Sequence, residues 1–257
     1  MIVAGIDIGS RSSKCVLMNA QGIKGYHIQD TGFAGLNVAN ETLNGALNKT
    51  NLSREDISYI VATGYGRVSV SFAQENISEI SCHAKGAHYF FPSVRTILDM
   101  GGQDVKAISV DETGKIRNFI MNEKCAAGTG RFLELIGSIL NVSLDDIGKL
   151  ALSSSKHINI SAACALYVKS EALVLLKQGV PKVDILAAIH NALANRTVTF
   201  LNRIDVVEDL VFTGGIGKNV AMVEMIREKM GITPLIHSEP AISGAVGAAV
   251  FALERGG

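Results

Sequence analysis

Residues 6–22 read IDIGSRSSKCVLMNAQG, and residues 98–114, LDMGGQDVKAISVDETG, repeat this pattern 92 positions later without a gap. The copies share Asp7/Asp99, Gly9/Gly101, Lys14/Lys106, Asn19/Asp111 and Gly22/Gly114. Each copy reads as an apolar strand that ends in Asp-x-Gly, a short turn, a second strand and a polar turn into a third strand. Helical patterns follow each copy, so the sequence predicts two similar α/β domains that face each other across a cleft.

The order of predicted elements sets the domain boundaries. The first copy is followed by a helical pattern at 34–49, a capped start at 53–56, a strand at 58–64 and helices up to residue 90. After the second copy we predict helices at 130–140, 164–179, 184–204, 219–230 and 243–254, and strands at 209–215 and 233–236. We assign residues 1–92 to the first domain, completed by the C-terminal helix 243–257, and residues 93–242 to the second domain.

The composition excludes several classes of protein. The 257 residues are 47% hydrophobic and 19% charged, which is enough to bury a core. Lys plus Arg and Asp plus Glu both total 24, so no net charge favours nucleic acid or an anionic membrane as a partner. Asp7 and Arg11 come too early for a signal peptide, and no apolar run approaches the ~20 residues that span a bilayer. We therefore expect a cytoplasmic chain.

Four glycine turns, at 9–14, 101–104, 127–131 and 213–219, are suited to hold phosphate with backbone N–H groups. A single such turn after a strand often does no more than reverse the chain, but two of these four are related by the repeat. No GxxxxGK[ST] motif is present, which excludes a P-loop protein. The predicted nucleotide-binding residues are Gly9, Ser10, Arg11, Ser12, Ser13, Lys14, Asp99, Gly101, Gly102, Ala127, Gly128, Thr129, Gly130, Arg131, Gly214, Gly215, Lys218 and Asn219.

Three residues in the repeated turns are candidates for catalysis. Asp7, together with Asp99, suits a hydrated Mg²⁺, although both residues could equally cap turns. Gln103 is placed to orient a water for in-line attack on a γ-phosphate. Asp104 is a proton acceptor, a group that contacts the metal's water shell, or a structural cap.

The motifs resemble those of the actin, sugar kinase and Hsp70-like ATPase superfamily. GIDIGSRSSK and LDMGGQD resemble its two phosphate motifs, LVFTGGIGKN its adenosine motif, and SGAVGAAV its second connecting helix. This resemblance implies duplicated RNase H-like domains with ATP or ADP in the cleft between them. ATGYGR, EISCHAKGA, DMGGQDVK, MNEKCAAGTGRFLE and ISAAC together resemble, more narrowly, the ATP-dependent activators of 2-hydroxyacyl-CoA dehydratases and the related benzoyl-CoA reductase ATPase subunits.

The narrower resemblance implies an ATPase coupled to electron transfer. It implies a homodimer that holds one [4Fe-4S] cluster through Cys125 and Cys164 of each subunit. The donor would be a ferredoxin or flavodoxin, and the acceptor a partner iron–sulfur enzyme. Four thiolates related by a two-fold axis suit a cubane, but they also suit tetrahedral Zn²⁺. We interpret the other two cysteines, Cys15 and Cys82, as buried apolar side chains.

The sequence departs from the activators at Arg11, where a small hydroxyl residue is usual, and at Tyr167 and Lys169 in ALYVKSE, where they carry Thr-Val-Phe-Ala-Glu-Ser-Glu. These differences leave open whether the electron acceptor is a dehydratase, another reductase or a double-cubane cluster protein. A small-molecule kinase with Asp104 as general base, and an actin-like assembly protein, are alternatives that leave the cysteines unexplained. We interpret His83 and His190 as structural.

Overall fold

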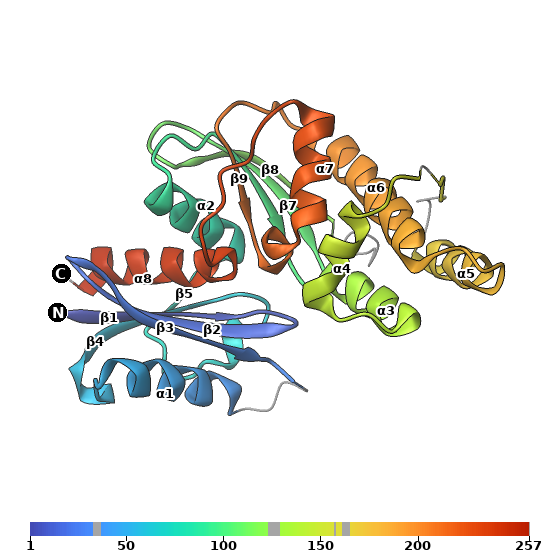
Figure 1. Ribbon diagram of the computed structural model, residues 1–257. Helices are drawn as coiled ribbons and strands as arrows, with labels where there is room; N and C mark the ends of the chain where they lie inside the picture. Colours follow the sequence, from blue (N-terminus) through green and yellow to red (C-terminus); the bar gives the residue numbers. More distant parts are fainter. Residues whose placement is uncertain (33–36, 123–128, 157, 161–164, 257) are drawn as a thin grey trace.

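The computed structural model describes residues 1–32, 37–122, 129–156, 158–160 and 165–256. It contains two β-sheets with two helices between them and further helices on their outer faces (Figure 1). We call the part built around the first sheet the first lobe and the part built around the second sheet the second lobe. Within the described residues, no helix combines the length and apolar character needed to cross a membrane.

The first sheet has the strand order β3-β2-β1-β4-β5. Its strands are β1 (Ile2–Ile8), β2 (Ser12–Asn19), β3 (Gly22–Asp30), β4 (Ile57–Thr63) and β5 (Glu75–Asn76). Helix α1 (Val38–Thr50) packs on one face through Leu43 and Leu47. Helix α8 (Ser243–Gly256) packs on the other face through Ala245 and Ala249, so the end of the chain returns to the first lobe (Figure 1).

The second sheet has the order β8-β7-β6-β9. Its strands are β6 (Thr96–Met100), β7 (Val105–Val110), β8 (Ile116–Asn122) and β9 (Leu210–Thr213). The repeat is preserved in the strand register: Asp7 pairs with Lys14 across β1 and β2, and Asp99 pairs with Lys106 across β6 and β7. The duplicated α/β fold predicted from the repeat is confirmed.

Helices α2 (Glu79–Phe90) and α8 lie between the sheets and contact each other closely (Figure 1). A Cβ added at Gly86 would lie 1.9 Å from the Ser243 carbonyl oxygen, and one at Gly247 would lie 1.8 Å from that of Cys82. Both distances are too short for any side chain, so this contact requires glycine. The opposite side of α2 packs on the second sheet through Ala84 and Ala87. The helix pair therefore joins the two lobes.

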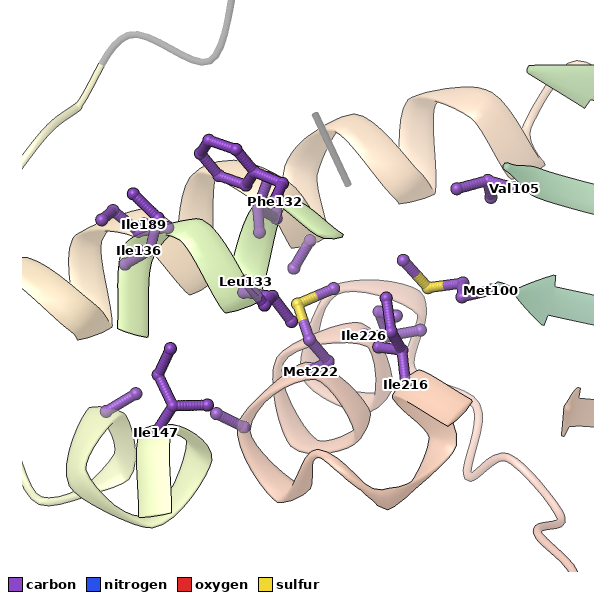
Figure 2. Packing of buried hydrophobic residues seen from close by; sticks show 14 of the residues in the cluster. Met100, Val105, Phe132, Leu133, Ile136, Ile147, Ile189, Ile216, Met222 and Ile226 are labelled. Atoms are coloured by element: carbon purple, nitrogen blue, oxygen red, sulfur yellow. The ribbon is translucent and has the colours of Figure 1, made fainter. Parts of the chain in front are cut away.

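A large apolar core on the outer face of the second sheet fixes the helices around the end of β6. These helices are α3 (Gly130–Leu140), α4 (Leu144–Leu152), α5 (Ala165–Lys177), α6 (Lys182–Leu201) and α7 (Val220–Met230). Figure 2 shows Phe132 and Ile136 of α3, Ile147 of α4 and Met222 of α7 in one apolar cluster with Met100 of β6. This core holds the first residues of α3, α4 and α7 in fixed positions near the end of β6.

Most predicted elements are present, with several differences. The capped segment at 53–56 is a short 3₁₀ turn, η1 (Arg54–Asp56), whose Ser53 and Asp56 form a capping box. The strand predicted at 233–236 is reduced to a single bridge between Leu235 and Val211. Helix α4 was not predicted. Cys15 and Cys82 are fully buried, as predicted, and burial raises the pKa of the Cys82 thiol to about 12.

Candidate functional site

A cavity of about 680 Å³ lies between the two lobes, where the turns after β1 and β6 face each other. Most of the predicted nucleotide-binding and catalytic residues line it. They are Asp7, Gly9, Ser10, Arg11, Ser12, Lys14, Asp99, Gly101, Gly102, Gln103, Asp104, Gly130, Gly214, Gly215, Lys218 and Asn219. The fold therefore brings together residues that are more than 200 positions apart in the sequence.

The first turn carries a lysine into the cavity. The Gly9 N–H donates to the Ser12 carbonyl at 3.1 Å, and Lys14 Nζ lies 3.1 Å from Asp7 Oδ2. Side chains alternate along β2, so Ser12 and Lys14 reach the cavity and Ser13 does not. The Ser13 hydroxyl is instead buried on the other face, 2.7 Å from Thr42 Oγ1, so the structure does not bring the side chain of this predicted residue to the cavity.

The second turn is joined directly to the start of α3. The Gly101 N–H donates to the Asp104 carbonyl, while the N–H groups of Gly130 and Arg131 donate to the carbonyls of Gly101 and Gly102, each at 3.0 Å. Gln103 is exposed in the cavity. Any displacement of this turn must therefore act on the N-terminus of α3.

Asp99 lies in a buried polar network behind the second turn. Its Oδ1 accepts from Thr213 Oγ1 at 2.8 Å and lies 3.1 Å from His83 Nδ1, while its Oδ2 lies 3.2 Å from Lys106 Nζ. Burial alone would raise the pKa of this carboxyl, but His83, Lys106 and Thr213 outweigh that effect and lower the pKa to about 2. Asp99 is therefore ionised at neutral pH.

Lys106 forms ion pairs with three carboxylates. Its Nζ lies 3.2 Å from Asp99, 2.8 Å from Asp104 and 3.4 Å from Glu79, and its side chain is only 2% exposed. Burial opposes its charge, but the three carboxylates raise the pKa of Lys106 above its ordinary value. Burial also opposes the charge of Glu79. It raises the pKa of this carboxyl, and the attraction of Lys106 only partly offsets the effect. Lys106 thus positions Asp104 at the edge of the cavity.

The third glycine turn closes the opposite side of the cavity. Gly214 has φ +84°, and a Cβ there would lie 2.3 Å from the Met100 carbonyl oxygen, so only glycine fits. The turn continues as a 3₁₀ helix, η3 (Gly215–Lys218). Asn219 caps α7, because its Oδ1 accepts from the N–H groups of Ala221 and Met222, both at 3.1 Å.

Two further predicted residues have structural contacts in this region. Lys218 Nζ lies 2.6 Å from Glu239 Oε2. Asn219 Nδ2 lies 3.1 Å from His190 Nε2, and His190 Nδ1 lies 2.7 Å from the Leu186 carbonyl oxygen. Burial lowers the pKa of His190. His190 thus supports Asn219 from behind, which agrees with its interpretation as a structural residue.

Several cavity residues were not predicted from the sequence. They are Tyr65, Glu79, His83, Lys106, Glu134, Leu144, Asp145, Gly148 and Lys149. The cavity residues on α4 could have been found from the start signal of that helix. The Ser143 side chain accepts from the Asp146 N–H at 3.2 Å, just before an apolar helical pattern. His83, which we interpreted as structural, lines the cavity and contacts Asp99.

The two repeated aspartates converge near His83. A Cβ added at Gly244 would lie 3.2 Å from Asp7 Oδ2 and 3.0 Å from His83 Nε2, and the other ring nitrogen of His83 contacts Asp99. One or two carboxylates beside phosphate oxygens suit Mg²⁺, which retains much of its water shell. The donor set therefore fits a hydrated Mg²⁺, although no group of three or more His, Cys, Asp or Glu within the described ranges forms a metal cage by itself.

The remaining predicted residues belong to the segments beside α3 and α5. Ala127, Gly128, Cys125 and Cys164 lie outside the described residues. Thr129 is the buried N-cap residue of α3, and Arg131 Nη2 lies 3.5 Å from the Ser10 carbonyl oxygen. In the sequence Cys164 directly precedes α5, and Cys125 precedes α3 by five positions.

Two β-sheets built from a duplicated hairpin, with a cavity between two Asp-x-Gly turns, define an ATPase of the actin-like fold. The chain belongs to the BadF/BadG/BcrA/BcrD ATPase family, whose sequence pattern matches residues 4–252. It is 40% identical over 255 residues to the activator of lactoyl-CoA dehydratase of Anaerotignum propionicum, a match that covers 99% of this chain and 98% of that protein.

Two crystal structures share the fold throughout. The (R)-2-hydroxyglutaryl-CoA dehydratase component A of Acidaminococcus fermentans matches with a TM-score of 0.96 and 37% identity, over 100% of this chain and 99% of that one. The activator of the 2-hydroxyisocaproyl-CoA dehydratase of Clostridium difficile, solved with bound ADPNP, matches with a TM-score of 0.95 and 36% identity, over 100% and 96%. The resemblance to dehydratase activators drawn from the sequence motifs is confirmed.

Proposed function

We propose that this protein is an ATP-driven activator that passes a low-potential electron from a shared [4Fe-4S] cluster to a partner iron–sulfur enzyme. The observation that carries the proposal is the pair of 3.0 Å hydrogen bonds from the Gly130 and Arg131 N–H groups to the carbonyls of Gly101 and Gly102. They join the second phosphate turn to α3, the helix that follows Cys125 in the sequence. A change at the nucleotide can therefore act on the start of α3.

The cavity supplies the groups that nucleotide binding requires. The turns at 9–14 and 101–104 present backbone N–H groups from both lobes, and Lys14 supplies a positive charge. Ile216, Gly148 and Leu144 line the end nearest α4 and α7, where we place the adenosine. Asp7 and Asp99 would hold Mg²⁺, which neutralises phosphate charge when it is bound.

Hydrolysis depends on Gln103 and Asp104. Gln103 orients a water whose oxygen bonds to the γ-phosphorus as the bond to ADP breaks. Asp104, held by Lys106 at 2.8 Å, is placed to accept the proton of that water. Asp99 and Glu79 hold Lys106 in turn, so the buried network fixes the catalytic turn before the nucleotide arrives.

The cluster is proposed on the two remaining cysteines. Cys125 and Cys164 precede α3 and α5 in the sequence, and helix N-termini favour the anionic form of a thiolate. The two helices pack against each other in the second lobe. Two subunits would supply four thiolates, the number that a cubane takes. A ferredoxin or flavodoxin would reduce the cluster.

The sequence of α5 differs from that of the activators, and this difference favours another candidate for the electron acceptor. Tyr167 is 65% exposed on the first turn of α5, and Lys169 follows within the same turn. These side chains lie where the activators carry Phe and Glu, beside the proposed cluster, and would therefore change the docking surface. A double-cubane cluster protein is our second candidate for the partner.

The cluster is tested by anaerobic purification. We expect a brown homodimer with about four irons per dimer. Cys125→Ser and Cys164→Ser should each lose the iron. Cys15→Ser and Cys82→Ser are the matched controls and should retain it, because both thiols are buried in apolar cores away from α3 and α5. Full iron retention in Cys164→Ser would contradict the shared cluster.

Electron transfer is tested with the reduced protein and a purified partner. We expect reduction of the partner with ATP, and none with ADP or ADPNP. Equal transfer rates with all three nucleotides, or without nucleotide, would contradict the coupling even if the protein hydrolyses ATP. Supplying a dehydratase and a double-cubane protein in separate reactions distinguishes the two acceptors.

A further inference from the structure

Arg11 joins the two lobes at the edge of the cavity. It lies in the turn between β1 and β2, and its Nε contacts Glu134 Oε1 on α3, although 123 positions separate the two residues. Its Nη1 also lies 2.9 Å from Asp30 Oδ1. Arg11 thus connects the first phosphate turn to the helix that is already bonded to the second phosphate turn, in addition to the 3.5 Å contact of Arg131 Nη2 with the Ser10 carbonyl oxygen.

The bridge lies at a point where the two phosphate turns are close to each other. A Cβ added at Gly102 would lie 2.6 Å from Arg11 Cβ and 3.2 Å from Ser10 Oγ. In the repeat, Arg11 is the counterpart of Gln103, since both follow Asp-x-Gly by two positions. The two side chains thus enter the cavity from facing turns, around the place where the turns would enclose a terminal phosphate.

The chemistry of the pair allows an exchange of partners. The side chains of Arg11 and Glu134 are 41% and 32% exposed, and ion pairs exposed to this degree contribute little to stability. A guanidinium binds phosphate oxygens with two parallel hydrogen bonds, and a terminal phosphate carries more negative charge than a carboxylate. A γ-phosphate within reach of Arg11 therefore competes effectively with Glu134.

We propose that Arg11 is a positioning residue that distinguishes ATP from ADP by exchanging Glu134 for the γ-phosphate. Without a γ-phosphate, Arg11 pairs with Glu134 and ties α3 to the first lobe. With ATP bound, Arg11 turns to the γ-phosphate and releases α3. This inference rests on the nucleotide site of the proposed function and adds a coupling between the terminal phosphate and α3. A coupling of this kind must appear as a difference in affinity between the two nucleotides.

The test measures equilibrium binding of Mg-ADP and Mg-ADPNP to the full-length protein. Arg11→Thr should weaken ADPNP binding about 5- to 10-fold and change ADP binding less than about twofold, because only ADPNP has a third phosphate. Glu134→Gln should act in the opposite direction. It removes the competitor for Arg11 and should strengthen ADPNP binding about two- to fivefold. In the double variant, Arg11→Thr with Glu134→Gln, the affinity for ADPNP should equal that of Arg11→Thr alone, because no arginine remains for which Glu134 could compete.

The matched control is Arg255→Thr. Arg255 Nε lies 3.2 Å from Glu75 Oε2, with side-chain exposures of 52% and 32%, and neither residue lines the cavity. This variant should leave both affinities unchanged. Equal weakening of ADP and ADPNP in Arg11→Thr would overturn the exchange, as would unchanged or weaker ADPNP binding in Glu134→Gln.

Failure of this inference is distinguishable from failure of the proposed function. If the parent protein binds both nucleotides and assembles no cluster, the electron-transfer proposal fails, while the opposite shifts in the two variants still support the exchange. If the cluster is present and the variants leave the ratio of the two affinities unchanged, the exchange alone fails. Thermal unfolding of each variant establishes that the binding changes come from a folded protein.

Discussion

The two copies of the repeat have the same backbone geometry and different charge environments. In both, an aspartate at the end of one strand pairs with a lysine on the next. Lys14 pairs with Asp7 at 3.1 Å and is 12% exposed at the cavity. Lys106 is 2% exposed and is surrounded by three carboxylates.

The same difference extends to the neighbouring parallel strands. Thr63 lies opposite Asp7, and Thr213 lies opposite Asp99. Thr213 donates to Asp99 at 2.8 Å, whereas the buried Thr63 hydroxyl makes no corresponding hydrogen bond to Asp7 within the described residues. The comparison indicates that the first copy leaves its cation available to a ligand. The second copy uses its cation internally to hold Asp104 and the turn that carries Gln103.

The largest expected effect is the difference in stability loss between variants of Lys106 and Lys14. Lys106→Met leaves three carboxylates without their shared cation and should cost about 3–5 kcal/mol of stability, lowering the thermal midpoint by roughly 10 °C. Lys14→Met leaves only one carboxylate without its partner, at the wall of the cavity, and should cost less, about 2 kcal/mol. Lys85→Met, which breaks a half-exposed pair with Glu254, is the control. Equal shifts in the Lys14 and Lys106 variants would contradict the comparison.

The next effect concerns the facing turns. Gln103→Ala should slow ATP hydrolysis about 100-fold and leave Mg-ADPNP binding largely intact, because water placement is lost while both phosphate turns remain. Arg11→Thr, at the equivalent position of the first copy, should instead change binding of the terminal phosphate. Hydrolysis under single-turnover conditions checks the first expectation. An unchanged rate in Gln103→Ala would remove this side chain from the mechanism.

The buried network around Asp99 predicts that the stability of the fold decreases at acidic pH. The folded pKa of Asp99, about 2, lies below the ordinary 3.8. The carboxylate therefore stabilises the fold fully above about pH 4, and this contribution, of roughly 2 kcal/mol, is lost as the pH falls toward 2. The difference in thermal midpoint between the parent protein and Asp99→Asn should thus be largest near neutral pH and narrow toward pH 2. A difference that does not change with pH would contradict the lowered pKa.

The smallest effect compares the polar turns that end the two copies. Gly22 and Gly114 have φ +115° and +77°, so alanine is strained at both and should cost about 1 kcal/mol. A Cβ at Gly114 would also lie 2.6 Å from the His88 ring, whereas one at Gly22 would lie 3.4 Å from Tyr89 Oη at its nearest. Gly114→Ala should therefore lower the thermal midpoint more than Gly22→Ala does. The reverse order would contradict this packing difference.

Much of the fold could be predicted because its signals are local. Helix α3 spans the predicted residues, and each copy of the repeat folds as the three predicted strands. Hydrophobic period and glycine turns determine such elements within a few neighbours. Helix α4 was missed, although Ser143 and Asp146 mark its start. Alternation along β2 should have excluded Ser13 from the cavity, because it follows Ser12 and precedes Lys14.

The sequence by itself determined the duplicated hairpins, the cavity between their turns and most of the residues that line it, because a repeat carries its backbone geometry and its turn glycines with it. Only the tertiary structure decided which charges meet. Glu79 comes from a helix between the sheets and joins Lys106, and Glu134 comes from the second lobe and meets Arg11 of the first. Ion pairing depends on distance in space and on desolvation, and neither is encoded in the spacing of residues along the chain.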